Sequence, residues 1–247
     1  MIAFAAAAAA AAPPAKTQYD QCLARIGGNP AGALQQAATW AKAGGGSGAE
    51  HCSALALVAL HRYGEAAAKL DSLARSAFGA DSAIRTQLYD QAGNAWLLAS
   101  RPDSAIASFS AALAIDPLDA DLLADRARAH AAKRNWAKAE SDLSAALLVN
   151  ASRADLYVLR GSARHALGRK AEARADFDRA LAIEPRNLDA LVERGINKYE
   201  AGDAAGGRAD WQAAVAASPG SPAGATARQY LADTAPATAP QPAPTRP

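Results

Sequence analysis

Apolar residues in the segment 154–187 recur at helical spacing in two short runs separated by a glycine. In the first run Leu156 and Leu159 share one helical face, and in the second run Phe177 and Leu181 do so. Each run therefore predicts an amphipathic helix, and together they predict a helical hairpin. Two helices this short bury too little surface to fold alone, so the hairpin needs neighbours.

The same pattern returns when the sequence is shifted by the length of this segment. Phe177 then aligns with Phe109, Leu143 and Trp211, and small residues align with small residues. Four such units follow one another without a gap: 86–119, 120–153, 154–187 and 188–221. A sustained period of this length in helix–turn–helix units indicates a stacked helical solenoid, and we therefore expect an all-α fold.

The units share an order of residue sizes: large apolar, small, small, aromatic or leucine, small, and in most units proline. In the unit 86–119 these residues are Tyr89, Gly93, Ala105, Phe109, Ala112 and Pro117. The order resembles the tetratricopeptide repeat (TPR) family, whose units have about 34 residues. The resemblance covers most of the chain and implies a right-handed superhelical solenoid of stacked antiparallel helix hairpins. It is specific for the fold and leaves the function open, because the family is defined by packing positions.

The segments that flank the four regular units follow the pattern more loosely. Residues 16–80 predict two divergent N-terminal TPR-like hairpins, with the glycine-rich stretch 44–48 as a flexible joint. The four regular units lie in the segment 81–221. Its first residues, 81–85, are an apparent insertion before the regular register resumes at Thr86. Residues 222–232 predict a capping helix, because serine followed by proline favours a helix start.

The two ends of the chain differ in composition from the rest. Residues 1–15 form an uncharged, alanine-rich apolar run that resembles a secretory signal peptide, although no lysine or arginine precedes it. The alternative is an alanine-rich leader without a targeting role, and the run is shorter than the ~18–20 residues of a membrane anchor. Residues 233–247 are rich in proline, alanine and threonine, which predicts a disordered tail. We therefore expect a secreted, periplasmic protein without stable membrane insertion.

The chain contains two cysteines, Cys22 and Cys52, one in the first helix of each N-terminal hairpin. Their separation is close to one repeat length, so the two helices are expected to be neighbours. In the oxidising compartment that the leader implies, the cysteines predict a disulfide that stabilises the N-terminal end by roughly 2–4 kcal/mol. The alternative is a pair of buried, reduced thiols.

One arginine and one aspartate recur at fixed positions of the regular units. They are separated by the same interval each time, and successive pairs are one repeat length apart: Arg126 with Asp142, Arg160 with Asp176, and Arg194 with Asp210. The first regular unit has Ala92 and Ser108 at these places and so lacks both charges together. This joint presence and absence predicts structural ion pairs between helices, and the alternative is a ladder of charges that binds a ligand.

The resemblance to the TPR family implies a concave groove lined by the first helix of each unit. It would have an acidic rim and an apolar patch near Val192, Ile196 and Tyr199. The family's chaperone-docking members hold a peptide carboxylate with Lys, Arg and Asn, and only Asn94 fits that pattern here. The predicted groove residues are Gln87, Asp90, Asn94, Leu98, Asp121, Arg128, Asp155, Ser162, His165, Val192, Ile196 and Tyr199.

Composition and motifs argue against several classes of function. With 26 basic and 24 acidic residues the net charge is only +2, so nucleic acid is not an expected partner. The four histidines stand at unrelated places in the repeat, and His165 is the one expected to face the groove. No spacing of metal ligands and no phosphate-binding glycine loop occurs, so we expect no metal, no cofactor and no enzymatic activity.

The function that these features favour is a scaffold in the bacterial envelope that binds a protein or extended peptide in its groove. The first alternative is a structural protein that assembles into a homo-oligomer. The second is a module that binds an envelope ligand such as a glycan, against which the small number of aromatic residues in the predicted groove argues.

Overall fold

The computed structural model describes residues 15–76 and 81–234, and these residues form thirteen α-helices and no strand. The expected leader and tail lie, apart from their innermost residues, outside the described residues. The helices are α1 Ala15–Ile26, α2 Pro30–Lys42, α3 Gly46–Ala59, α4 Tyr63–Ser76, α5 Ser82–Leu98, α6 Pro102–Leu113, α7 Ala120–Ala132, α8 Trp136–Val149, α9 Ala154–Ala166, α10 Lys170–Ile183, α11 Leu188–Glu200, α12 Ala204–Ala217 and α13 Pro222–Asp233. The expected all-α helical-repeat fold is therefore confirmed.

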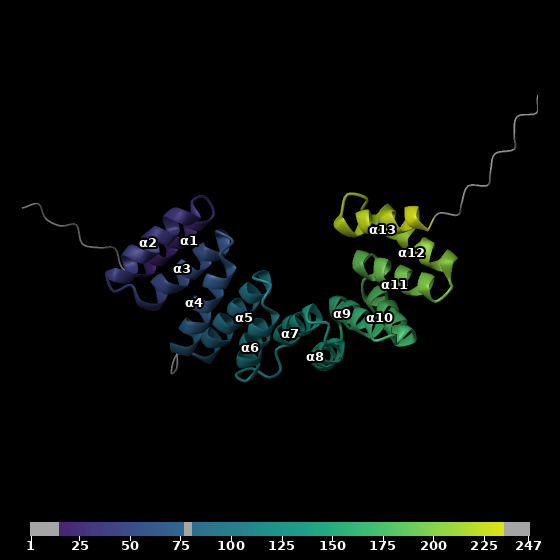
Figure 1. Ribbon diagram of the computed structural model, residues 1–247, viewed down its shortest axis with the longest axis horizontal. Coiled ribbons are helices and arrows are strands. Elements are labelled where there is room, and N and C mark those ends of the chain that lie inside the picture. Colours follow the sequence, from purple (N-terminus) through teal and green to yellow (C-terminus); the bar gives the residue numbers. More distant parts are fainter. Residues whose placement is uncertain (1–14, 77–80, 235–247) are drawn as a thin grey trace, which may run out of the picture. The chain divides into compact units, whose positions relative to one another are not determined.

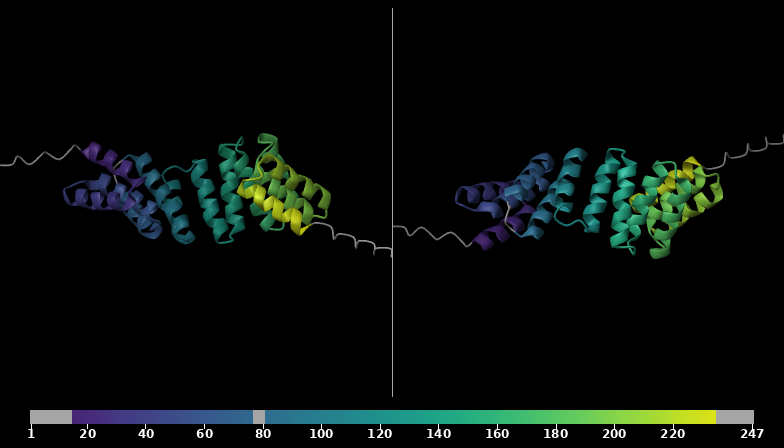
Figure 2. Two further views of the ribbon diagram at one scale, coloured as in Figure 1. Left: turned by 90° about the horizontal axis from the view of Figure 1, so that it is seen from above. Right: turned by 90° about the horizontal axis from the view of Figure 1, so that it is seen from below.

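The chain divides into two compact units, residues 1–129 and 130–247, called here the N-terminal and C-terminal units. In the N-terminal unit each helix from α1 to α5 packs against the next one along the chain (Figures 1 and 2). Helix α1 also packs against α3, so the first helices of successive hairpins are neighbours. This arrangement places α1, α3 and α5 in the order that a stack of hairpins requires.

The contact between α1 and α3 contains the two cysteines. Cys22 and Cys52 are wholly buried, and their sulfur atoms lie at bonding distance with the Cα atoms 6.3 Å apart. Three alanines, Ala33, Ala37 and Ala56, complete this small core. The separation of about one repeat therefore brings the cysteines together as the sequence predicts. The bridge closes a loop of 30 residues and joins the first two hairpins.

The glycine-rich stretch 44–48 is not the flexible joint expected from the sequence. Its first glycine, Gly44, ends α2 in the left-handed conformation, and α3 begins only two residues later. A Cβ atom on Gly45 would lie 2.6 Å from the indole of Trp40, and one on Gly48 would lie 2.8 Å from it. These glycines are present because the buried Trp40 ring occupies the space where side chains would be.

Residues 81–85, the apparent insertion in the sequence, belong to a helix. They form the cap and first turn of α5, which is 17 residues long. The carboxylate of Asp81 accepts a hydrogen bond from the backbone N–H of Ala83 at 2.9 Å, which satisfies one of the free donors at the helix start. The extra residues therefore lengthen the first helix of this unit by about one turn and leave the repeat register intact.

In the C-terminal unit consecutive helices from α8 to α13 pack against one another, and α13 also contacts α11. The predicted capping helix is thus present as α13, whose start is capped by Ser221 through a bond from the N–H of Gly224 at 3.0 Å. The ring of Tyr230 stacks on Trp211 with a centroid distance of 5.0 Å (Figure 2 shows α13 from two sides). Helix α13 therefore covers the last hairpin with aromatic surface.

Within three of the hairpins a glycine of the first helix faces an aromatic residue of the second helix. A Cβ atom on the glycine would lie 2.4–2.5 Å from the aromatic ring, far inside van der Waals contact. The remaining regular unit has Ala127 in place of the glycine and Leu143 in place of the aromatic residue. The added methyl group of alanine is thus matched by a smaller side chain opposite it. The three close pairs are Gly93 with Phe109, Gly161 with Phe177, and Gly195 with Trp211.

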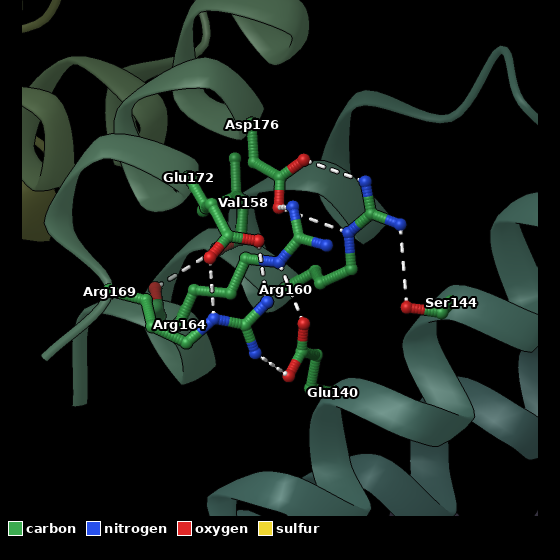
Figure 3. Close-up of polar contacts among 9 residues, drawn as sticks. Glu140, Ser144, Val158, Arg160, Arg164, Arg169, Glu172 and Asp176 are labelled. Carbon is green, nitrogen blue, oxygen red and sulfur yellow. Dashed lines mark hydrogen bonds and ion pairs between the residues drawn. The ribbon is translucent and has the colours of Figure 1, made fainter. Parts of the chain in front are cut away.

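The position before this glycine carries the predicted ion pair. Arg160 binds Asp176 through two nitrogens at 3.0 and 2.7 Å, and Arg194 binds Asp210 at 2.9 and 2.7 Å (Figure 3 shows the first pair). Asp176 is only 3% exposed. These two pairs form as the spacing predicts. Arg126 lies in the N-terminal unit and Asp142 in the C-terminal unit, and their pairing stays a prediction.

Each of these arginines also has a contact that was not predicted from the sequence. Its guanidinium donates to a polar side chain of the preceding hairpin's second helix, so one side chain links two hairpins. The acceptors recur at the repeat length and form a third repeating polar position in the sequence. The contacts are Arg126 with Ser110 at 3.2 Å, Arg160 with Ser144 at 3.4 Å, and Arg194 with Asp178 at 2.7 Å.

A further basic side chain, one helical turn after the arginine position, approaches the buried aspartate in three of the hairpins. The distances are 2.9 Å for Arg164 to Asp176, 2.8 Å for Lys198 to Asp210, and 3.9 Å for His130 to Asp142. Arg164 also binds Glu140, which in turn accepts from Arg169 (Figure 3). A carboxylate buried in this way is stabilised because charged partners replace the water that it loses.

Gly161→Ala is expected to lower the free energy of unfolding by about 1–3 kcal/mol, because the new methyl group overlaps the ring of Phe177. Adding Phe177→Leu should make the double variant more stable than the sum of the two single changes predicts, as the Ala–Leu combination of the unit 120–153 suggests. Urea denaturation measures both. The matched control is Gly64→Ala, where the nearest atom is 3.8 Å from the new Cβ. Strict additivity would contradict the steric explanation.

Arg160→Ala is expected to cost about 2–4 kcal/mol, because it deprives the buried Asp176 of a two-point partner and leaves it with Arg164. Arg169→Ala is the control, since its side chain is 40% exposed and its solvent-screened ion pairs should contribute little to stability. Thermal and urea denaturation compare the two variants. Equal stability of both would show that the buried pair does not hold the hairpin.

Candidate functional site

In the N-terminal unit most of the predicted groove residues remain accessible. Gln87 and Leu98 on α5 and Asp121 and Arg128 on α7 are at least partly exposed, and Asp90 on α5 is half-buried. Asn94, also half-buried, donates from Nδ2 to Asp90 Oδ1 at 2.9 Å and lies 3.4 Å from Asp125 Oδ2, which links the two helices. These residues therefore lie at the surface formed by the first helices of two hairpins.

The prediction of an exposed apolar patch in the C-terminal unit is wrong. Val192 is 6% exposed and belongs to a core cluster with Trp211, against which Ile196 also packs. The ring of Tyr199, although 38% exposed, lies 5.6 Å from the Trp211 ring. The reason is that this position of the first helix packs inside the stack: Val192 shares its cluster with Ala227 of α13, and Val158, one repeat length earlier, is buried in a cluster with Ala190 of α11.

Polar groove residues of the C-terminal unit are engaged inside the unit. Ser162 donates to a backbone carbonyl at 3.0 Å, and Asp155 binds Arg153 at 2.7 Å. Nε2 of His165 lies 3.2 Å from the carboxylate of Glu200, and its Nδ1 accepts from Nδ2 of the buried Asn197 at 3.2 Å. His165 is therefore hydrogen-bonded within the unit through both ring nitrogens.

A residue not predicted from the sequence, Glu193, lies beside Ser162 and His165 on this face of α11. Burial raises the pKa of Glu193. The signal that could have found it is a carboxylate one residue before the recurring Arg194 on the first helix of a unit.

A cavity of about 360 Å³ opens among α1, α3, α4 and α5 of the N-terminal unit. Its apolar walls come from Leu73, Ile84 and Leu88, and Ile84 is 51% exposed at its rim. The volume falls in the usual range for ligand pockets, about 300–1,000 Å³. The predicted groove residue Gln87 and the unpredicted residues Tyr19, Ser47, Gly48, His51 and Gln91 complete the lining.

A chain of three side chains crosses this cavity. The hydroxyl of Tyr19 lies 2.6 Å from Nδ1 of His51, and Nε2 of His51 lies 2.8 Å from Oε1 of Gln91. An imidazole protonated on Nε2 satisfies both contacts, with Tyr19 as donor and Gln91 as acceptor. Burial, and then the charge of Asp20, raise the pKa of Tyr19, so its hydroxyl keeps its proton. The sequence signal was proximity to the cysteines, since Tyr19 precedes Cys22 by about one turn and His51 adjoins Cys52.

An acidic cluster adjoins the cavity, with Asp90 on α5 and its other members at or near the start of α7. The pKa of Asp90 rises to about 6, mainly because of burial and then because of the charges of Asp125, Asp119 and Asp121. The hydrogen bond from Asn94 opposes this shift only in part. Asp125 also forms an ion pair with Arg128, whose side chain is 46% exposed. The surface beside the cavity is therefore acidic, in agreement with the rim expected from the sequence.

The chemistry of these residues suits binding. Among residues 15–76 and 81–234, no group of three or more His, Cys, Asp or Glu side chains is arranged to hold a metal ion. In the same part of the chain, no helix combines the length and the apolar character needed to cross a bilayer. The cavity offers apolar walls with an acidic margin, which can hold an apolar side chain beside a cation.

The helix pairs and their repeat spacing define a class of helical-repeat protein, and comparison with known proteins specifies it. Residues 154–187 match the family model described as tetratricopeptide repeat. These residues are therefore similar to a tetratricopeptide repeat, and the described helices have a helical-repeat fold. No curated protein matches the chain.

Three solved structures are similar to this chain. MamA has a TM-score of 0.59 at 15% identity, covering 66% of this chain and 93% of that chain. YrrB, described as a TPR protein with an unusual peptide-binding site, has a TM-score of 0.57 at 18% identity. The match covers 73% of this chain and 91% of YrrB. The first TPR of Spaghetti (RPAP3), bound to an HSP90 peptide, has a TM-score of 0.46 at 31% identity. The match covers 47% of this chain and 93% of that domain. At such low identity the likeness to MamA and YrrB shows the fold.

Asp90→Asn is expected to stabilise the folded chain at neutral pH. The folded pKa of about 6 exceeds the usual 3.8, so the unfolded chain ionises first as pH rises, and ionisation destabilises the fold above about pH 4. The amide keeps the acceptor for Asn94. We expect a gain of about 1 kcal/mol at pH 7, reduced by solvent screening, and almost none near pH 3.5.

Urea denaturation at the two pH values measures this gain, with Asp233→Asn in the exposed part of α13 as the control. The same gain at both pH values would contradict an origin in the raised pKa.

Proposed function

We propose that this chain is a non-enzymatic scaffold that binds an extended segment of a partner protein, chiefly through its N-terminal unit. The observation that carries the proposal is the cavity among α1, α3, α4 and α5, with accessible polar residues on the adjoining face of α5. Stacked hairpins hold these helices in fixed positions, which suits recognition of a chain that runs across several of them.

Two further points support a protein segment as the ligand. YrrB, whose fold is similar, is described as having a peptide-binding site. In the described part of this chain the histidines at the candidate site, His51 and His165, have both ring nitrogens engaged with neighbouring side chains. These contacts hold both imidazole rings in fixed positions, which suits a preformed binding surface.

The proposed location is the bacterial envelope. Residues 1–15 resemble a secretory signal peptide, and the buried pair Cys22 and Cys52 is placed for a bridge that an oxidising compartment would maintain. Both features fit an exported scaffold. Intact mass of the chain purified from its own cells tests this location: retention of residues 1–15, or thiols that react without a reductant, would contradict it.

Site-specific photo-crosslinking in living cells tests the binding surface. A benzophenone amino acid replaces Ile84, which is 51% exposed at the cavity rim, or in the control Leu148, which is 90% exposed on α8. Both positions carry an exposed aliphatic side chain, so the exchange is tolerated equally. A partner protein that is crosslinked from position 84 and absent at position 148 is the expected result, identified by mass spectrometry.

Three results would overturn the proposal. The same products at both positions would indicate nonspecific contact, and no product at position 84 would mean that the cavity binds no protein. A second copy of this chain as the sole product would replace the scaffold by the self-assembling structural protein that is its main alternative.

A further inference from the structure

We propose that the groove of the N-terminal unit selects basic protein segments that carry one bulky apolar side chain. The apolar side chain would enter the cavity lined by Leu73, Ile84 and Leu88, and a lysine or arginine beside it would lie against Asp90 and Asp125. This inference rests on the proposed function and names the class of partner.

The cavity itself favours an apolar occupant. Leu73 and Leu88 line it, and the exposed Ile84 supplies apolar surface at its mouth. Burying a large aliphatic or aromatic side chain there removes apolar surface from water on both partners, which contributes roughly 25 cal/mol for each Å² buried. A volume of about 360 Å³ accommodates such a side chain.

The polar residues of the cavity are already used by one another. Both nitrogens of His51 are engaged, one with Tyr19 and the other with Oε1 of Gln91. A charged or strongly polar side chain would lose its hydration on entering the cavity. To regain hydrogen bonds it would have to break the contacts among Tyr19, His51 and Gln91. The network therefore excludes polar occupants and leaves the apolar walls to determine what enters.

The margin of the cavity determines the sign of the charge. Four carboxylates, those of Asp90, Asp119, Asp121 and Asp125, are close enough for the last three to raise the pKa of the first. Arg128 pairs with Asp125, whereas the partner of the Asp90 carboxylate is the neutral amide of Asn94. The negative charge of Asp90 attracts a cation and repels a carboxylate, so charge complementarity identifies the partner as basic.

The two parts are spaced for one extended chain. Leu88 and Gln91 line the cavity, and Asp90 and Asn94 lie within two turns of them on the same helix. Two helical turns measure ~11 Å, and an extended peptide advances ~3.3 Å per residue. The basic residue should therefore stand about two to four positions from the apolar one.

Selection from a random twelve-residue peptide library on the immobilised full chain tests this inference. We expect the recovered peptides to be enriched in lysine and arginine near one Phe, Leu, Ile, Met or Trp. In fluorescence anisotropy, changing Lys to Glu or the apolar residue to Ala in a recovered peptide should each weaken binding at least about tenfold.

Variants of the chain assign the two preferences to their residues. On Asp90→Asn with Asp125→Asn, the same library should lose its enrichment in basic residues and keep the apolar one, and on Ile84→Ala the reverse. The control replaces two exposed carboxylates of the C-terminal unit, Glu184→Gln with Asp233→Asn, and should behave as the original chain. Circular dichroism confirms that each variant is folded.

The outcomes separate this inference from the proposed function. Acidic or uncharged peptides that bind through Ile84 would overturn the inference and leave the scaffold function intact. Enrichment in basic residues that persists on the Asp90 and Asp125 variant would also overturn it, because the charge preference would then arise elsewhere. A library that yields no peptide, together with no crosslink at position 84, would overturn both.

Discussion

Close approach of the two helices in each hairpin is the constraint on which the rest of the structure depends. Where Gly161 removes the side chain from α9, the ring of Phe177 on α10 fills the space, and the preceding residue Arg160 reaches the buried Asp176. Steric fit and charge pairing thus operate at the same spacing of 16 residues. Because one arginine also contacts the preceding hairpin, the device that closes a hairpin also sets how hairpins stack.

The two units use their polar residues differently. In the C-terminal unit the carboxylates of Asp176 and Asp210 each have two cationic partners, and the first helices interact with one another. In the N-terminal unit Ser108 stands where the buried aspartate would be, and it donates to Asp71 at 2.8 Å. The N-terminal unit also has a cavity beside an acidic cluster whose charges raise the pKa of Asp90. Binding is therefore proposed where these recurring internal ion pairs give way to other contacts.

Predictions from the sequence fail where one side chain changes the meaning of its neighbours. The glycines 44–48 suggest flexibility until Trp40 is placed against them, and Val192 suggests an exposed patch until Trp211 covers it. His51 stands at no regular repeat position, so periodicity could not indicate that it connects α1 to α5. For Trp40 and His51 the deciding contact joins residues whose spacing does not follow the repeat.

The sequence by itself determined the repeat: its length, the helix pairs, the cysteine pair and the charge pairs of the C-terminal unit. It could do so because a periodic contact recurs at constant spacing, so the same residue types at the same position of several units support one interpretation. Only the tertiary structure decided where a cavity opens, which groove residues remain exposed and which carboxylate is destabilised by its neighbours. Those properties depend on the volumes and charges that meet from several helices, and no single spacing along the chain records them.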